Sequence, residues 1–124
     1  MKSYEYPAGV FRARCVKVVD GDTADFVVDA GFHSHRIERF RFSLIDTPEL
    51  RDRDETKREA AKLAKDYVIR ALMSHEEWPL RIETERDPDS FGRYLCMIYF
   101  MEDGEEVCLN DRLVEDGHAI YRTY

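Results

Sequence analysis

The stretch "RFSLIDTPEL", residues 41–50, begins as a β-strand and ends on two carboxylates three residues apart. Apolar and other side chains alternate through residues 40–45, which is the period-two pattern of a half-buried strand. Asp46, Thr47, Pro48 and Glu49 then follow directly. An apolar strand that carries an arginine and ends on two acids needs a physical reason, and the rest of the chain supplies candidates.

Other segments repeat the strand pattern, separated by turn residues. Asp20-Gly21 predicts a tight hairpin turn, because glycine accepts a positive φ. Residues 87–92, "DPDSFG", and Asp103-Gly104 predict two more turns. With the opening stretch, these signals predict five strands, at residues 11–19, 22–30, 36–45, 79–84 and 93–101.

Two segments have a helical pattern instead. Between residues 60 and 72, apolar side chains recur at spacings of three and four, which predicts an amphipathic helix packed on a core. Thr56 and Glu59 form one candidate capping box, and Asp52 or Asp54 are alternative starting points. Residues 110–116 predict a short helix that Asn110 caps. Glycine at position 117 ends it.

The order of these elements predicts the fold class. Three meandering strands, a helix, two strands and a small helix indicate an α+β protein that is mainly β. Five strands with a helix after the third is the order of the OB-fold, a small Greek-key barrel. At 124 residues, positions 1–124 form a single domain.

Composition excludes several classes of protein. The net charge of -7 argues against tight nonspecific binding to nucleic acid or to anionic membranes. No run of eighteen apolar residues is present, and the first residues lack a signal-peptide core, so we expect a cytoplasmic protein unless a leader has been removed. The cysteines Cys15, Cys96 and Cys108 lack a CxxC pair, so we expect reduced thiols and no zinc site.

Two aspartates lie at the ends of predicted strands. Asp22 follows the first tight turn, and Asp46 closes the third strand. Two carboxylates, a carbonyl and water are ligands that a hard cation such as Ca²⁺ accepts. Turns and strand ends also favour aspartate for purely structural reasons, and spacing alone leaves both interpretations open.

Two arginines adjoin apolar strand residues. Arg41 shares its strand with phenylalanines, and Arg93 begins the last strand. A guanidinium in such a place needs an anionic partner, since a buried unpaired charge is costly. The partner is either a nearby carboxylate or a phosphate, which the guanidinium fork binds through two hydrogen bonds.

Three motifs in order resemble the staphylococcal nuclease (thermonuclease) family. They are "VVDGDT" at residues 18–23, "RFSLIDTPEL" at residues 41–50 and "DSFGRYLCMIY" at residues 89–99. The later segment "LNDRLVEDGHA", residues 109–119, is similar to the family's second helix. The resemblance extends from about residue 11 onward. It implies an OB-fold barrel that hydrolyses DNA and RNA with Ca²⁺, as an endonuclease.

The resemblance also implies roles for particular residues. Asp22, Asp46 and the Thr47 carbonyl would bind Ca²⁺. Glu49 would act as general base or orient the attacking water. The scissile phosphate would be bound by Arg41 and Arg93. All six positions hold the residue type that the family uses, which favours an active nuclease over the alternative of a non-catalytic OB-fold module that binds single-stranded nucleic acid or a protein.

Some positions depart from the family. Where the family has a lysine and a tyrosine that hold a terminal phosphate, this chain has Ser90 and Phe91. Phe91 could stack on a base, and Tyr121 is a further candidate substrate contact. Few phosphate contacts would give binding a weak salt dependence. Residues 1–9 read as an N-terminal extension, and the family's third helix has no counterpart before residue 124, which leaves a dimer open.

Overall fold

The structure, a computed structural model, describes residues 9–123, so all but one residue of the proposed N-terminal extension lies outside the described part. Strand β1 (Gly9–Asp20) is long and has two partners. Its first half pairs with β5 (Leu80–Arg86) and its second half with β2 (Thr23–Asp29), both antiparallel. Two register shifts, at residues 15–17 and 18–20, bend the strand.

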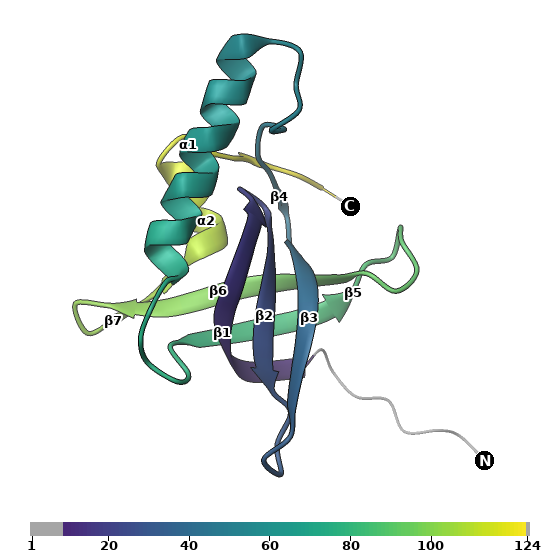
Figure 1. Cartoon of the computed structure of the whole chain (residues 1–124), viewed down its shortest axis with the longest axis vertical. Helices are drawn as coiled ribbons and strands as arrows, with labels where there is room; N and C mark the ends of the chain where they lie inside the picture. The colour runs from purple at the N-terminus through teal and green to yellow at the C-terminus, as the bar shows by residue number, and fades with distance from the viewer. Residues whose placement is uncertain (1–8, 124) are drawn as a thin grey trace.

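The barrel closes between two strands that are far apart in the sequence. Strand β3 (His35–Phe42) pairs with β2, and β6 (Tyr94–Glu102) pairs with β5. A parallel pairing of β3 with β6 joins the two ends, so β1, β2, β3, β6 and β5 form a closed circuit (Figure 1). The predicted α+β fold, a five-stranded OB-fold barrel, is confirmed.

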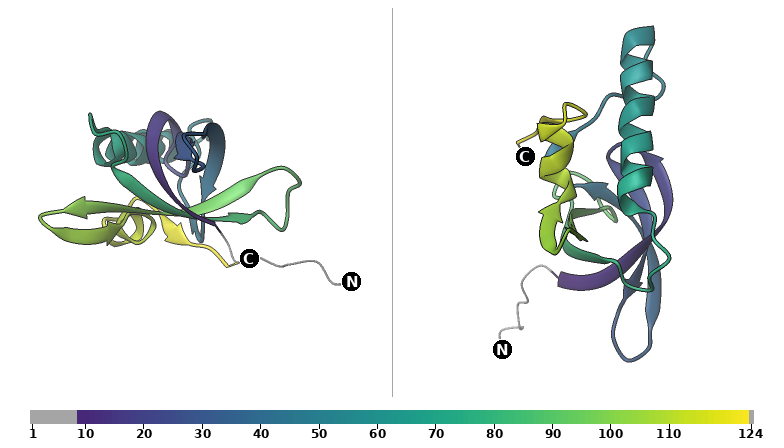
Figure 2. Two further views of the ribbon diagram at one scale, coloured as in Figure 1. Left: turned by 90° about the horizontal axis from the view of Figure 1, so that it is seen from below. Right: turned by 90° about the vertical axis from the view of Figure 1, so that its left-hand side faces the viewer.

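Helix α1 (Glu55–Leu72) packs beside β1, and α2 (Leu109–Glu115) lies next to it (Figures 1 and 2). Helix α1 is capped by Asp54, whose carboxylate accepts the amide hydrogens of Thr56 and Lys57. Of the starting points that the sequence allowed, Asp54 is therefore the N-cap. The apolar stripe predicted between residues 60 and 72 includes Leu63, but Leu63 is exposed, so the buried face of α1 differs from the predicted one. Small and branched side chains form the buried face: Ala61, Ala64, Val68 and Leu72.

The prediction that the third strand continues to residue 45 is wrong. Strand β3 ends at Phe42, and Leu44 has a φ of 66°, the left-handed conformation. This kink reverses the alternation, so Leu44 is exposed and Ile45 is fully buried. A separate short strand, β4 (Ile45–Asp46), follows the kink.

Two short strands in the second half of the chain were not predicted. β7 (Glu105–Cys108) forms a hairpin with β6, closed by Asp103 and Gly104, both with positive φ. β8 (Ile120–Tyr121) pairs with β4 and forms a separate two-stranded sheet. Through this pairing, the last described residues lie directly beside the residues that follow β3.

The prediction that Asn110 caps the second helix is also wrong. The helix begins after Cys108, and the Asn110 side chain is buried in the core. Its amide nitrogen donates to the carbonyls of Ser43 and Cys96, and its oxygen accepts from the Ile98 amide. Asn110 therefore links α2 to β6 and to the kink after β3.

Neither helix of the described chain is long and apolar enough to cross a membrane. The three cysteines, Cys15, Cys96 and Cys108, are free thiols, as predicted. Burial raises the pKa of the Cys15 thiol to about 11 and that of Cys96 well above its ordinary value. Thiols with raised pKa values are poorly reactive at neutral pH.

Candidate active site

A cavity of about 800 Å³ opens at the end of the barrel where β2 begins and β3 ends. Four separate segments contribute to its walls: the turn before β2, the stretch from β3 through β4 to the following loop, the residue before β6, and the residue after β8. The fold thus brings together every residue predicted to bind metal or to act in catalysis. They are Asp22, Arg41, Asp46, Thr47, Glu49 and Arg93.

The kink after β3 is held by hydrogen bonds to neighbouring strands. The amide of Phe42 donates to the carbonyl of Asp22 at 2.8 Å, and the amide of Ser43 donates to the carbonyl of Cys96 at 2.9 Å. Asn110 donates to the Ser43 carbonyl at 3.0 Å. Because these bonds join the kink to β2, β6 and α2, the backbone that leads to Asp46 has a fixed position in the cavity wall.

Arg41 lies between two aspartates. Its side chain is 11% exposed, and Nη1 is 3.4 Å from Oδ2 of Asp22. Nη2 donates to Oδ1 of Asp46 and, at 3.3 Å, to the carbonyl of Ile45. The two carboxylates are therefore close enough to share one cationic group, which compensates the guanidinium charge in a largely buried place.

Asp22 is buried, and burial is the main reason that its pKa is raised above the ordinary range. The neighbouring carboxylate of Asp20 adds to the effect, whereas the amide of Thr47, which donates to Oδ2 at 3.1 Å, and Arg41 oppose it. The charged form of this aspartate is thus disfavoured in the protein alone. Additional positive charge in the cavity would favour it.

Gly21 allows the turn before β2 to approach the loop after β4. A Cβ atom at Gly21 would lie 2.9 Å from Cβ of Ala64 and 2.9 Å from Oγ1 of Thr47. Glycine is therefore required at position 21 for close approach. The sequence suggested a positive φ as the reason, but Gly21 is not among the described residues with positive φ. The turn, the loop and helix α1 meet at this point.

The donor atoms at this end of the cavity fit a hard cation. Ca²⁺ prefers carboxylate and carbonyl oxygens, and Asp22, Asp46 and the Thr47 carbonyl would supply them. The Thr47 hydroxyl is buried and has no hydrogen-bond partner among residues 9–123, so a further oxygen is available nearby. No cluster of three or more His, Cys, Asp or Glu side chains in that range could hold a metal, so water would complete the coordination shell.

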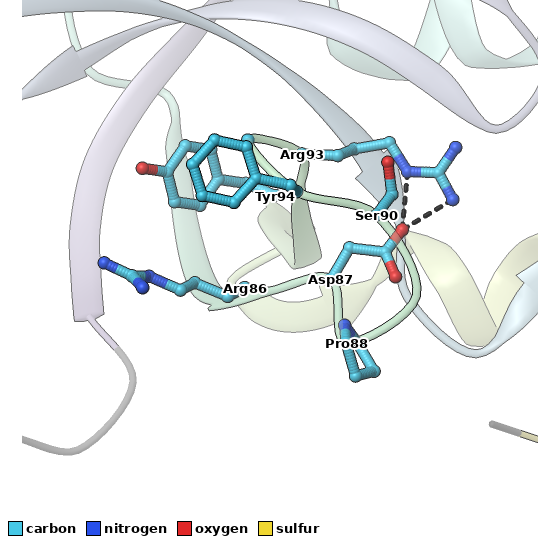
Figure 3. A pocket seen from close by; sticks show the side chains of 8 residues that line it. Arg86, Asp87, Pro88, Ser90, Arg93 and Tyr94 are labelled. Carbon is cyan, nitrogen blue, oxygen red and sulfur yellow. Dashed lines mark hydrogen bonds and ion pairs between the residues drawn. The ribbon is translucent and has the colours of Figure 1, made fainter.

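Arg93 is anchored by an acid that the sequence analysis did not single out. Its Nε and Nη2 atoms both lie 2.5 Å from Oδ2 of Asp87 (Figure 3). The Asp87 side chain is fully buried, and its Oδ1 accepts the amide of Asp89 at 2.9 Å. This amide, followed by the Arg93 charge, lowers the pKa of Asp87. The turn that the sequence predicted here thus positions Arg93 as well.

Glu49 occupies the loop between β4 and α1. It lines the cavity and its side chain is exposed to solvent. The loop is braced by the Asp52 amide, which donates to the Glu49 carbonyl at 3.1 Å. A carboxylate at the cavity wall that also reaches solvent can accept a proton from water.

The two candidate substrate contacts lie in different places. Phe91 is completely exposed and lines a hollow of about 360 Å³ beside the main cavity, together with Arg41 and Arg93. Tyr121 lies in β8, where its hydroxyl donates to Asp111 at 3.2 Å. Tyr121 is not one of the described residues that line the main cavity.

Several cavity residues were not predicted from the sequence. Asp20 precedes the turn, Arg51 lies in a charged stretch that resembles an ordinary helix start, and Arg122 follows β8. Arg122 places Nη1 3.6 Å from Oδ1 of Asp46. A two-residue strand has no recognisable period, so no sequence pattern indicated that Arg122 reaches this cavity.

The closed barrel and its charged cavity define a nuclease-like or nucleic-acid-binding OB-fold domain. The family described as staphylococcal nuclease homologue matches residues 39–124, which is more than half of the chain. The chain therefore belongs to the staphylococcal nuclease homologue family. Asp22 precedes the matched stretch and joins the site through its contact with Arg41. Comparison with curated proteins gives no significant match.

Proposed function

We propose that this protein is a Ca²⁺-dependent nuclease that hydrolyses phosphodiester bonds in DNA, RNA or both. The observation that carries the proposal is the meeting of two carboxylates, a further exposed carboxylate and two arginines in one cavity. Phosphodiester hydrolysis needs positive charge around the phosphate oxygens and a group that accepts a proton from the attacking water. This set of side chains meets both needs.

The arginines would bind the scissile phosphate. Arg93 uses Nε and Nη2 for its anchor, Asp87, so its outer end is directed by a buried residue. Arg41 would exchange its contacts with Asp22 and Asp46 for contacts with phosphate oxygens as substrate binds. Both guanidiniums stabilise the negative charge that develops on the phosphate in the transition state.

Glu49 would accept the proton of the attacking water. Asp22, Asp46 and the Thr47 carbonyl would hold Ca²⁺, which as a Lewis acid supplies further positive charge beside the phosphate. Burial disfavours the charged form of Asp22, so a bound cation would stabilise that form.

The alternative function is a non-catalytic module that binds single-stranded nucleic acid. The fully exposed Phe91 beside Arg41 and Arg93 supports it, since bases stack on exposed aromatic side chains. The two functions share a binding surface and differ in whether a bond is broken.

Cleavage of single-stranded DNA, duplex DNA and RNA, in Ca²⁺ and in excess chelator, tests the proposal. A nuclease cuts at least one substrate in Ca²⁺ and stops cutting in chelator. Binding without cutting under any condition would establish the alternative, and Ca²⁺-independent cutting would contradict the assignment of Asp22 and Asp46 as metal ligands. Thermal unfolding with and without Ca²⁺ reports metal binding separately, because a ligand of the native state raises the midpoint.

A further inference from the structure

Arg122 is held in the wall of the candidate active site by its own backbone. β8 pairs with β4 in register, Tyr121 opposite Ile45. The amide of Arg122 then donates to the carbonyl of Leu44 at 2.7 Å, which continues this pairing beyond the strand. The position of Arg122 relative to Asp46 is therefore set by a hydrogen-bonded ladder.

The Arg122 side chain shares a carboxylate with Arg41. Its Nη1 is 3.6 Å from Oδ1 of Asp46, the same oxygen that accepts from Nη2 of Arg41. The side chain is about one-third exposed, so it reaches both the cavity and solvent. Its charge also contributes to lowering the pKa of Asp87, after the Asp89 amide and Arg93, which places it within electrostatic reach of the Arg93 anchor.

The cavity is positive relative to the rest of the protein. Four arginines line it, at positions 41, 51, 93 and 122, and four acids, at positions 20, 22, 46 and 49, so their formal charges cancel. The whole chain has a net charge of -7. Against that background a neutral cavity that contains several guanidiniums repels a polyanion less than the acidic surface as a whole does.

We propose that Arg122 is a substrate-binding residue that contacts a phosphate adjacent to the scissile one on the same nucleic-acid strand. This inference rests on the proposed function and extends it to substrates longer than a single phosphodiester. Arg41 and Arg93 would bind the scissile phosphate, and Arg122 reaches the cavity from the residue that follows β8. Its long side chain and planar fork suit a phosphate oxygen pair.

The test measures binding separately from cleavage. The protein carries Glu49→Gln to prevent turnover, and the probe is a fluorescent single-stranded DNA oligonucleotide in Ca²⁺, with salt varied between 50 and 200 mM, a range over which phosphate contacts change affinity strongly. We expect Arg122→Gln to weaken binding by about two- to fivefold. We also expect it to reduce the slope of log K against log salt by about 0.7, one phosphate contact on a single strand.

Two further variants control for charge and for folding. Arg122→Lys keeps the charge and should keep most of the slope. Arg36→Gln removes an equal charge from an exposed pair with Glu38 and should leave the slope unchanged. An unchanged slope in Arg122→Gln, while the parent protein binds the oligonucleotide, would overturn the role of Arg122 alone. If the Glu49→Gln protein does not bind the oligonucleotide and the protein with Glu49 does not cut nucleic acid, the proposed function is overturned as well.

Discussion

The two ends of strand β3 carry arginines in very different surroundings. Arg36 lies near the hairpin end and Arg39 in the second half of the strand; they are 64% and 57% exposed and pair with Glu38 and Asp25. Arg41, two residues beyond Arg39, is 11% exposed and contacts both aspartates of the cavity. The same residue type therefore forms a solvated salt bridge at one end and part of a buried charge cluster at the other.

The ion pairs of Arg12 and Arg93 show that distance does not make this distinction. Arg12 and Asp29 approach to 2.5 Å, as do Arg93 and Asp87. The Asp87 side chain is fully buried, however, whereas that of Asp29 is 16% exposed. An exposed pair is screened by water and contributes little, and a buried carboxylate depends on its partner. Burial of the acid therefore distinguishes the Arg93 pair from the Arg12 pair.

The largest expected effect is on catalysis. Arg93→Gln should lower kcat/KM for nucleic-acid cleavage by about 10²- to 10³-fold, because it removes transition-state charge stabilisation. The exposed counterpart Arg36→Gln should change the rate by less than about twofold. Initial rates on one substrate in Ca²⁺ measure both. Similar losses in the two variants would contradict the distinction between the cavity arginine Arg93 and the exposed arginine Arg36.

The same comparison predicts stability. Arg93→Ala leaves the Asp87 carboxylate without its cationic partner and should reduce the free energy of unfolding measurably. Arg12→Ala, which breaks a more exposed pair of equal length, should reduce it less. Urea unfolding at pH 7 measures both values. Equal losses of stability in Arg93→Ala and Arg12→Ala would show that water reaches the Asp87 carboxylate.

The contribution of the Asp87 charge to stability depends on pH, and the direction of its pKa shift gives the sign of that dependence. The pKa of Asp87 is lowered in the folded protein, first by the Asp89 amide and then by Arg93. The stability that its charge contributes is therefore present above the ordinary aspartate pKa, 3.8, and is lost as pH falls through the lowered value. The destabilisation caused by Asp87→Asn should be constant near neutral pH and shrink in acid. Unfolding midpoints measured from pH 7 down to about 2.5 test this.

Asp87 should also affect catalysis, through Arg93. Asp87→Asn should lower kcat/KM about tenfold, because the guanidinium loses its anchor. In an Arg93→Gln background the same substitution should have almost no further effect on rate, which a double-mutant cycle measures. If Asp87→Asn lowers kcat/KM as much in the Arg93→Gln protein as in the unsubstituted protein, Asp87 affects catalysis other than through Arg93.

The smallest expected effect concerns metal affinity. Arg41 neutralises the two aspartates that would bind Ca²⁺. Arg41→Gln should therefore bind Ca²⁺ a few-fold more tightly while cleaving nucleic acid more slowly, because the competing charge is gone. Isothermal titration gives the affinity, with Arg39→Gln as the exposed control. Weaker Ca²⁺ binding in Arg41→Gln would mean that Arg41 orients the carboxylates instead.

Much of the barrel could be predicted from the sequence because its strands are regular. Period-two alternation located five strands, and chain order placed Asp22, Asp46 and Arg93 at strand ends. The kink at Leu44 could not be predicted, because leucine has no preference for the left-handed conformation that hydrogen bonds impose there. Extrapolating the alternation through the kink put the wrong residue in the core.

The supporting residues of the site were also invisible in the sequence. Asn110 resembles an ordinary helix cap, and only the fold brings it against Ser43 and Cys96. Asp87 resembles a turn residue, and nothing local to it reveals that it is buried against Arg93. Arg122 reaches the cavity through the pairing of two very short strands. In each case the contact depends on segments distant in sequence, which periodicity does not report.

The central claim is that the cavity breaks phosphodiester bonds with Glu49 as the proton acceptor. The most direct test is the single-turnover cleavage rate of single-stranded DNA in saturating Ca²⁺ by the unsubstituted protein, by Glu49→Gln and by Glu59→Gln, which alters an exposed glutamate on α1. We expect a fall of about 10²-fold or more for Glu49→Gln and no change for Glu59→Gln. A rate in Glu49→Gln within about threefold of the unsubstituted protein would contradict the claim.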